Sequence, residues 1–280
     1  MASLLQKLKG RAQGNKIASS LQDNFEGSGF HLLLFAVFVL HILTINEASN
    51  LNVFNFINGL SPSVPAWLQA SVTDMGNGVT LGAVILCYLV YRPELCCRVV
   101  VAAVLSLIMV PLLKQYFDAP RPAVILDYLN IIGEVRHEHS FPSGHAATAF
   151  LLAGIIFLST SKHWLKLLVV ATAALVAGSR IMVGAHWPED VVMGAFVGLL
   201  CAYGAVKFVP LIVLSSSVRV QLYLVLFATI VISEFKNGDD FPQYWQVQVI
   251  RWSFILLSGL LILRFWLRSF PPKMLKNQVN

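Results

Sequence analysis

Eight apolar runs, separated by polar segments, are the feature that most restricts how this chain can fold. They lie near residues 30–45, 76–91, 99–113, 144–160, 164–183, 190–206, 220–233 and 250–267. Apolar residues make up 57% of the 280 residues and charged residues only 12%, which is unlike an ordinary soluble domain. A helix needs about 20 apolar residues to cross a bilayer, so we expect the shorter runs to extend into their flanks. The sequence therefore predicts an all-α fold, a polytopic integral membrane helical bundle.

Lysine and arginine are divided unevenly between the two sides of this series of spans. Fourteen of the 20 fall on the side of the N-terminus. The other side receives six, namely Lys114, Arg121, Arg136, Arg180, Lys236 and Arg251. Because positive residues collect in cytoplasmic segments, this division predicts cytoplasmic termini and an extracytoplasmic opposite side. The seventh run, 220–233, is shortened by Arg219 and Gln221, so it could instead lie in the interface.

Three polar clusters lie where apolar runs meet polar segments on that opposite side. They occupy residues 114–122, 142–145 and 179–190. A phosphate ester under cleavage gathers negative charge on its equatorial oxygens, so its site needs fixed cations and hydrogen-bond donors. Lys114, Arg121 and Arg180 supply the cations. Ser143 and Gly144 stand just before an apolar run, where the start of a helix leaves free N–H groups for an anion.

Two histidines in these clusters fit the remaining chemistry of phosphate transfer. A neutral imidazole can attack phosphorus, and a protonated one can donate to the leaving alcohol. Pro188 favours the first turn of a helix, which places Asp190 where its carboxylate can hold one ring nitrogen of His186. His186 is therefore the candidate nucleophile, and His145, beside the phosphate-binding helix start, is the candidate general acid.

The three clusters resemble the motifs of the type-2 phosphatidic acid phosphatase superfamily. This family includes membrane lipid phosphatases, glucose-6-phosphatases and vanadium haloperoxidases, and every position of its pattern holds the expected residue here. The resemblance implies that His186 is the nucleophile, with Asp190 as its partner and His145 as the acid. It also implies a phosphate cradle made of Lys114, Arg121, Ser143, Gly144 and Arg180. No metal ion and no other cofactor is expected.

The runs and motifs divide the chain into four predicted parts. These are a cytoplasmic N-terminal segment, 1–28, a six-helix phosphatase core, 29–206, two extra C-terminal membrane helices within 207–267, and a cytoplasmic tail, 268–280. We interpret the first apolar run as an uncleaved anchor rather than a signal peptide. Compact motif spacing and outward segments without Asn-x-Ser/Thr favour a bacterial inner membrane as the location.

Together these features predict an integral membrane phosphatase that hydrolyses lipid-linked phosphomonoesters or pyrophosphates at the outer face through a phosphohistidine. The expected partners are membrane lipid and a lipid phosphate substrate, with no nucleic acid. By resemblance the candidate substrates are undecaprenyl pyrophosphate, phosphatidylglycerol phosphate, phosphatidic acid, diacylglycerol pyrophosphate and the lipid A phosphates. The sequence does not choose among them.

Two functions of other classes remain as alternatives. One is an enzyme for a soluble substrate, either a sugar phosphatase or, with vanadate in the cradle, a haloperoxidase. The other is a non-catalytic lipid-binding or transport protein of the same fold. The presence of His145, His186 and Asp190 argues against the second alternative, because a binder needs the cations but neither a nucleophile nor an acid.

Two polar segments on the same side permit more than one interpretation. The segment 46–78 mixes aromatic and aliphatic residues with Ser, Asn and Pro, and it is either an amphipathic cover beside the site or a plain connecting loop. His137-Glu138-His139 offers potential metal ligands, but no third ligand is evident, so we favour a solvated loop.

Overall fold

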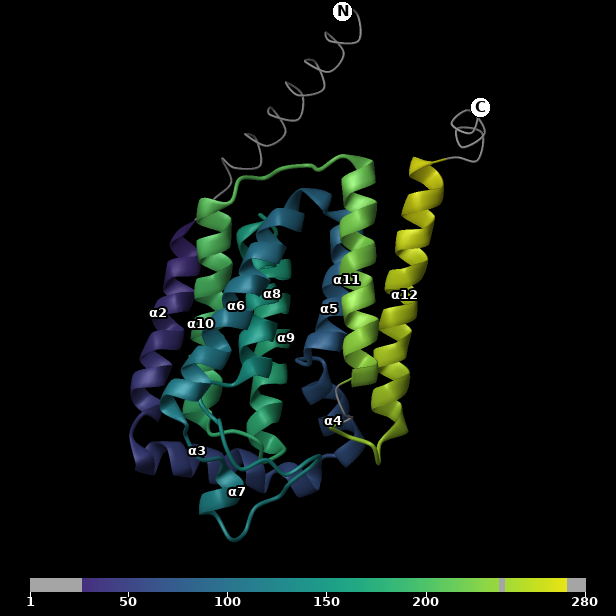
Figure 1. The fold of residues 1–280 in the computed structure, drawn as a ribbon. Coiled ribbons are helices and arrows are strands. Elements are labelled where there is room, and N and C mark those ends of the chain that lie inside the picture. The colour runs from purple at the N-terminus through teal and green to yellow at the C-terminus, as the bar shows by residue number, and fades with distance from the viewer. Residues whose placement is uncertain (1–26, 237–239, 271–280) are drawn as a thin grey trace, which may run out of the picture.

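A computed structural model describes residues 27–236 and 240–270, and the described residues form helices without a strand (Figure 1). The predicted N-terminal segment lies outside the described residues except for its last two. The predicted C-terminal tail is described only as far as residue 270.

Each of the eight apolar runs forms a helix. These helices are α2 (Gly27–Thr44), α5 (Gly78–Tyr91), α6 (Cys96–Phe117), α8 (Gly144–Leu158), α9 (His163–Met182), α10 (Pro188–Phe208), α11 (Ser216–Lys236) and α12 (Trp245–Ser269). Helices α6, α9, α10, α11 and α12 are each long and apolar enough to cross a membrane, whereas α2 and α5 qualify only as halves of bent pairs and α8 is shorter. The predicted fold class, an all-α polytopic membrane bundle, is confirmed.

The long helices run side by side, so their connections alternate between two ends of the bundle (Figure 1). One end carries the turns α5–α6, α8–α9 and α10–α11. The opposite end, which we call the loop-rich end, carries the segment between α2 and α5 and the long segment between α6 and α8. Helix α11 is 21 residues long and packs against α5 and α12, which favours a spanning helix over an interfacial segment.

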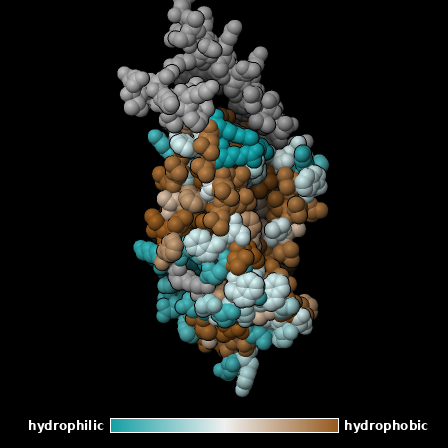
Figure 2. Space-filling view, turned by 90° about the vertical axis from the view of Figure 1, so that its right-hand side faces the viewer, coloured by the Kyte–Doolittle hydropathy of each residue, from teal (hydrophilic) through white to brown (hydrophobic). Residues whose placement is uncertain are grey.

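The sides of the bundle are hydrophobic between these two ends. Large apolar side chains such as Leu32, Leu107 and Leu260 are more than 60% exposed on α2, α6 and α12, an exposure that water would not favour. Figure 2 shows predominantly hydrophobic side chains across the middle of the face formed by α11 and α12, with hydrophilic ones gathered toward its ends. This surface suits a surrounding bilayer.

Short helices form in the segment 46–78, so the interpretation as a plain connecting loop is wrong. Helix α3 (Glu47–Gly59) is followed by a 3-10 turn, η1 (Ser61–Ser63), and by α4 (Ala66–Asp74). The α3 segment is bent by 102° from α2, and α4 is bent by 57° from α5. The Asn46 side chain accepts a hydrogen bond from Ser49 N, which caps the start of α3. Further short elements are η2 (Pro93–Leu95) and α7 (Pro122–Ile125).

Helix α8 packs on α6, α9 and α10, and its contact with α10 is the most extensive between any two described helices. Gly194 and Gly198, one turn apart on α10, face the backbone of α8. A Cβ atom at either glycine would collide with the carbonyl oxygen of Ser143 or of Ala147. The two backbones can approach only because these side chains are absent, and the N-terminal ends of α8 and α10 are thereby held together at the loop-rich end.

Candidate active site

All eight residues predicted for the site lie at the loop-rich end. They are Lys114 in the last turn of α6, Arg121 just before α7, Ser143, Gly144 and His145 at the start of α8, Arg180 near the end of α9, His186 in the turn between α9 and α10, and Asp190 in the first turn of α10. The polar clusters of the sequence therefore converge on one end of four long helices.

The imidazole of His186 lies between a carboxylate and a guanidinium. Its Nδ1 is 3.3 Å from Asp190 Oδ2, and its Nε2 is 3.4 Å from Arg121 Nη1. The His186 and Asp190 side chains are 3% and 1% exposed, so water does not screen this contact. A proton on Nδ1 can be held by the carboxylate, which leaves the lone pair of Nε2 on the side of the cations.

Ser140 also belongs to this group, although no motif in the sequence pointed to it. Its hydroxyl donates to Asp190 Oδ2 at 2.5 Å and lies 3.4 Å from His186 Nδ1, and the residue is fully buried. Asp190 Oδ2 also accepts from Trp187 N at 2.8 Å, as expected of an acidic residue in the first turn of a helix. These donors keep the carboxylate in one position beside the histidine.

The basic residues are held by backbone carbonyl groups of the surrounding loops. Arg121 Nε donates to Glu138 O at 2.9 Å, and Arg121 Nη1 donates to Ala185 O at 2.9 Å. Lys114 Nζ donates to the His139 carbonyl. Carbonyl oxygens orient the cations without neutralising them, so the positive charge remains available to an anion.

Burial and charge both act on His186. Burial, and after it the positive charges of Arg121, Arg180 and Lys114, lowers the pKa of His186 well below its ordinary value. The imidazole is therefore neutral near pH 7, which is the form that carries a nucleophilic lone pair.

Several buried polar atoms of the predicted site residues have no hydrogen-bond partner among the described residues. Beside Asp190 Oδ1, an acceptor, they include three that can donate, namely Ser143 Oγ, His145 Nε2 and Arg180 Nε. Because an unpaired buried polar atom costs free energy, a group of them from three motif residues is typical of a ligand site. A phosphoryl group, with several acceptor oxygens, matches a hydroxyl, a guanidinium and a protonated imidazole.

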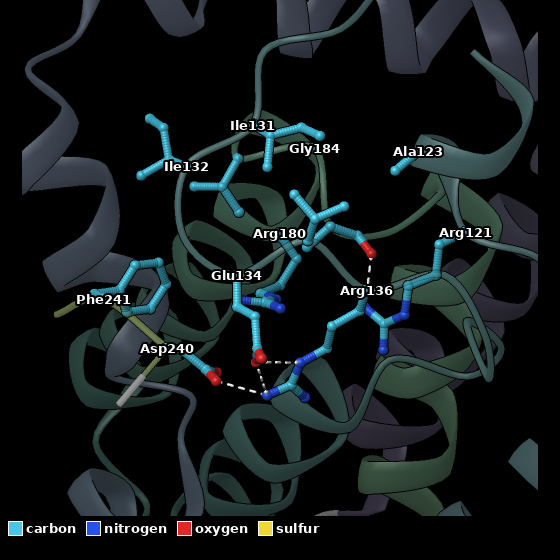
Figure 3. A pocket seen from close by; sticks show the side chains of 13 residues that line it. Arg121, Ala123, Ile131, Ile132, Glu134, Arg136, Arg180, Gly184, Asp240 and Phe241 are labelled. Carbon is cyan, nitrogen blue, oxygen red and sulfur yellow. Dashed lines mark hydrogen bonds and ion pairs between the residues drawn. The ribbon is translucent and has the colours of Figure 1, made fainter. Parts of the chain in front are cut away.

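A further arginine lies on the outer wall of the site. Figure 3 shows the side chains of Arg121, Arg136 and Arg180 around a small cavity. Arg136 Nη2 is 2.6 Å from Asp240 Oδ1 and 3.3 Å from Glu134 Oε2. The pair with Asp240 links the loop between α7 and α8 to the residues that precede α12.

Helix α3 supports the turn that carries His186. Asn58 Nδ2 donates to Asn130 O at 2.8 Å and to Met182 O at 3.0 Å. The ring of Phe54, buried on α3, packs on Trp187 with a centroid distance of 5.0 Å. Helix α3 thus covers the loop-rich end beside the site.

Residues 137–139 lie in the loop that precedes α8. The side chain of His139 is 49% exposed, and its Nδ1 lies 3.0 Å from Asp118 Oδ1. Within the described parts of the chain, no group of three or more His, Cys, Asp or Glu side chains is arranged to hold a metal ion.

Comparisons with known proteins agree with the resemblance found in the motifs. A family model described as the PAP2 superfamily matches residues 95–213, a range that contains all eight predicted site residues. A solved structure, that of LpxE from Aquifex aeolicus, is 30% identical and matches over 56% of this chain and 94% of its own, with a TM-score of 0.52. The chain therefore belongs to the PAP2 superfamily of phosphatases, and it is an integral membrane protein.

Two further relatives match over most of their length. The protein YbjG of Escherichia coli is 29% identical over 159 residues, which are 55% of this chain and 79% of YbjG. A protein of Sulfolobus acidocaldarius named undecaprenyl-diphosphatase is 26% identical over 182 residues, which are 63% of this chain and 88% of the relative.

Proposed function

We propose that this protein hydrolyses lipid-linked phosphomonoesters or diphosphates through a phosphohistidine at the extracytoplasmic face of a bacterial inner membrane. The observation that carries the mechanism is the position of His186. Its Nδ1 faces Asp190, and its Nε2 faces Arg121, within a buried cluster of cations. A nucleophile, a group that orients it and a binding site for the phosphoryl oxygens thus occur together.

In the first step His186 Nε2 attacks phosphorus, and the bond from phosphorus to the leaving oxygen breaks. Asp190 holds the Nδ1 proton and stabilises the positive charge that develops on the ring. Lys114, Arg121 and Arg180 bind the equatorial oxygens, where the negative charge is greatest in the transition state.

His145 acts as the acid in this step. It stands in the first turn of α8, and its Nε2 is buried without a partner among the described residues. The negative charge of a bound phosphoryl group favours the protonated imidazole, which donates its proton to the leaving oxygen. Ser143 Oγ and the backbone N–H groups at the start of α8 bind the same phosphoryl group.

The second step reuses the same groups. Water attacks phosphorus, His145 takes a proton from that water, and the bond between phosphorus and His186 Nε2 breaks. Inorganic phosphate leaves, and both histidines return to their starting protonation states.

A lipid substrate suits the surroundings of this site. The site lies at the end of a bundle whose sides expose large apolar residues, so a lipid chain can stay in the bilayer while its phosphate enters the cluster. The name of the Sulfolobus acidocaldarius relative makes a polyprenyl diphosphate the first substrate to test.

The extracytoplasmic orientation rests on charge. Of the 20 lysine and arginine residues, fourteen fall on the side away from the site, and three of the other six are the cations of the cradle. Under the positive-inside rule, this division supports cytoplasmic termini and an outward-facing site.

Our first prediction concerns substrate class and metal dependence. Purified protein in excess EDTA should release phosphate from detergent-solubilised undecaprenyl diphosphate, phosphatidylglycerol phosphate or phosphatidic acid faster than from glucose 6-phosphate. Orthovanadate, which mimics pentacoordinate phosphorus, should inhibit this release. Preference for glucose 6-phosphate would favour a sugar phosphatase, and a loss of activity in EDTA that added divalent metal restores would contradict the metal-independent mechanism.

Our second prediction distinguishes the roles of the two histidines by the leaving group of the substrate. His186→Ala should abolish turnover of every substrate. His145→Ala should lower the rate of hydrolysis of an alkyl phosphate by about 10²- to 10⁴-fold, because the leaving oxygen then departs without a proton. On an aryl phosphate, whose leaving group is a weak base, much of the first-turnover rate should return.

Burst kinetics and phosphoenzyme trapping measure this difference. Since the second step also uses His145, the variant should show a first-turnover burst on the aryl substrate without a full steady-state rate. Equal losses of burst rate on both substrates would show that His145 is not the acid. A phosphoenzyme that persists in His186→Ala would exclude His186 as the nucleophile.

Our third prediction concerns topology. In a variant whose four native cysteines are replaced, Tyr128→Cys at the loop-rich end should react with an impermeant maleimide in intact cells or spheroplasts. Ser161→Cys, at the other end of the bundle, should react only after permeabilisation. Both positions are exposed in the structure, so accessibility depends on the membrane alone. The reverse pattern would place the site in the cytoplasm.

A further inference from the structure

The two C-terminal helices contact the rest of the molecule through the elements beside the site. The region matched by the family model ends at residue 213, before α11 begins. Helix α11 packs on α5, and α12 packs on α5 and α4 (Figure 1). Helix α4 in turn packs on α9, which carries Arg180. A path of packed helices therefore leads from α12 to the phosphate cradle.

A buried group of charged side chains joins these helices, and we call it the Arg251 cluster. Arg251 on α12 contacts Asp74 Oδ1 through Nη2 at 2.5 Å and Asp74 Oδ2 through Nε at 3.3 Å. Its Nη1 contacts Glu234 Oε2 on α11 at 3.1 Å. The side chains of Arg251, Asp74 and Glu234 are 3%, 2% and 7% exposed. Buried charges are costly when separated, so this cluster tolerates little displacement of the helices that carry it.

Asp74 is the last residue of α4, and it fixes the bend between α4 and α5. Thr80 Oγ1, on the first turn of α5, donates to Asp74 Oδ2 at 2.6 Å. The Asn77 side chain accepts from Val79 N at 2.9 Å and caps the same helix start. Arg251 therefore holds the Asp74 carboxylate, which is also hydrogen-bonded to Thr80 across the turn at residues 75–77.

This turn lies against the imidazole of His145. A Cβ atom on Gly76 would lie 2.9 Å from His145 Cβ, 3.1 Å from His145 Cδ2 and 2.8 Å from Val176 Cγ1. Those distances leave no room for a side chain at residue 76, so the backbone of Gly76 packs directly against the side chain of His145. One residue before Asp74, Thr73 Oγ1 lies 2.6 Å from Ser179 Oγ, next to Arg180 in the chain.

We infer that Arg251 is a positioning residue for the reaction. Through Asp74 it holds the α4–α5 turn against His145, and this contact aligns His145 Nε2 with the leaving oxygen. The inference rests on the proposed function, because it requires His145 to be the acid. It gives α12 a role in the leaving-group step, although α12 contributes no residue to the phosphate cradle.

The test compares an alkyl and an aryl phosphate in the full-length purified protein. Arg251→Met should lower turnover of the alkyl phosphate by about 10 to 10²-fold, because a small misplacement of the acid is costly when the leaving oxygen needs a proton. First-turnover rate on the aryl phosphate should stay within about threefold of wild type, because that leaving group departs without help. Loss of helix packing alone would lower both rates together.

Two further variants make this comparison specific. Glu234→Gln alters the same buried cluster but leaves the Asp74–Arg251 contact, so its alkyl-to-aryl ratio should match wild type. Gly76→Ala pushes a Cβ atom toward His145 without removing any charge, so it should reproduce the selective loss on the alkyl phosphate. Gly76→Ala also keeps the inference testable where Arg251→Met fails to fold.

The outcomes distinguish this inference from the function on which it rests. In one outcome, His145→Ala lowers the rate on the alkyl phosphate selectively, whereas Arg251→Met and Gly76→Ala lower the rates on both substrates equally or not at all. That outcome would overturn the positioning role alone. A His145→Ala variant without leaving-group selectivity would overturn the role of His145 and this inference with it. A selective loss in both variants but not in Glu234→Gln would support the assignment.

Discussion

Three basic side chains and two histidines surround the carboxylate of Asp190 at the end of an apolar bundle, and the neighbouring helices and loops hold them in place. Like charges repel strongly where water is scarce. The protein orients Lys114 and Arg121 with backbone carbonyls rather than with carboxylates, so their charge is not cancelled. The carboxylate of Asp190 is turned toward His186. A phosphoryl anion carries the charge that balances such a cluster, which agrees with the phosphatase family to which the chain belongs.

The scaffold has to hold these groups within a fraction of an ångström, and several elements share that task. Gly194 and Gly198 let α8 and α10 approach until Ser143 N donates to the Asp190 carbonyl at 2.9 Å. Helix α3 supports the turn of His186 through Asn58 and Phe54. The α4–α5 turn closes the site around His145. In this account the family core supplies the chemistry, and the elements around it supply alignment.

The long helices and the candidate site residues could be predicted because both follow from patterns of residues that are close together in the sequence. An apolar run marks a span in lipid, and each polar cluster stands at the boundary of one. Ser140 could not be found in this way, since it lies in a polar loop and its partner, Asp190, is 50 residues away. Arg251 and Asp74 are separated by 177 residues. The sequence left the segment 46–78 open between an amphipathic cover and a plain loop, because polar residues interrupt its apolar ones, and contacts with the site loops stabilise α3.

The stereochemical course at phosphorus distinguishes the phosphohistidine mechanism from direct attack by water. A phosphorothioate monoester made chiral with oxygen isotopes would be hydrolysed in isotopically labelled water, and the configuration of the released thiophosphate would be determined. Each in-line displacement inverts phosphorus, so attack by His186 followed by attack of water predicts overall retention. Overall inversion would mean a single direct attack by water, and it would contradict the phosphohistidine mechanism.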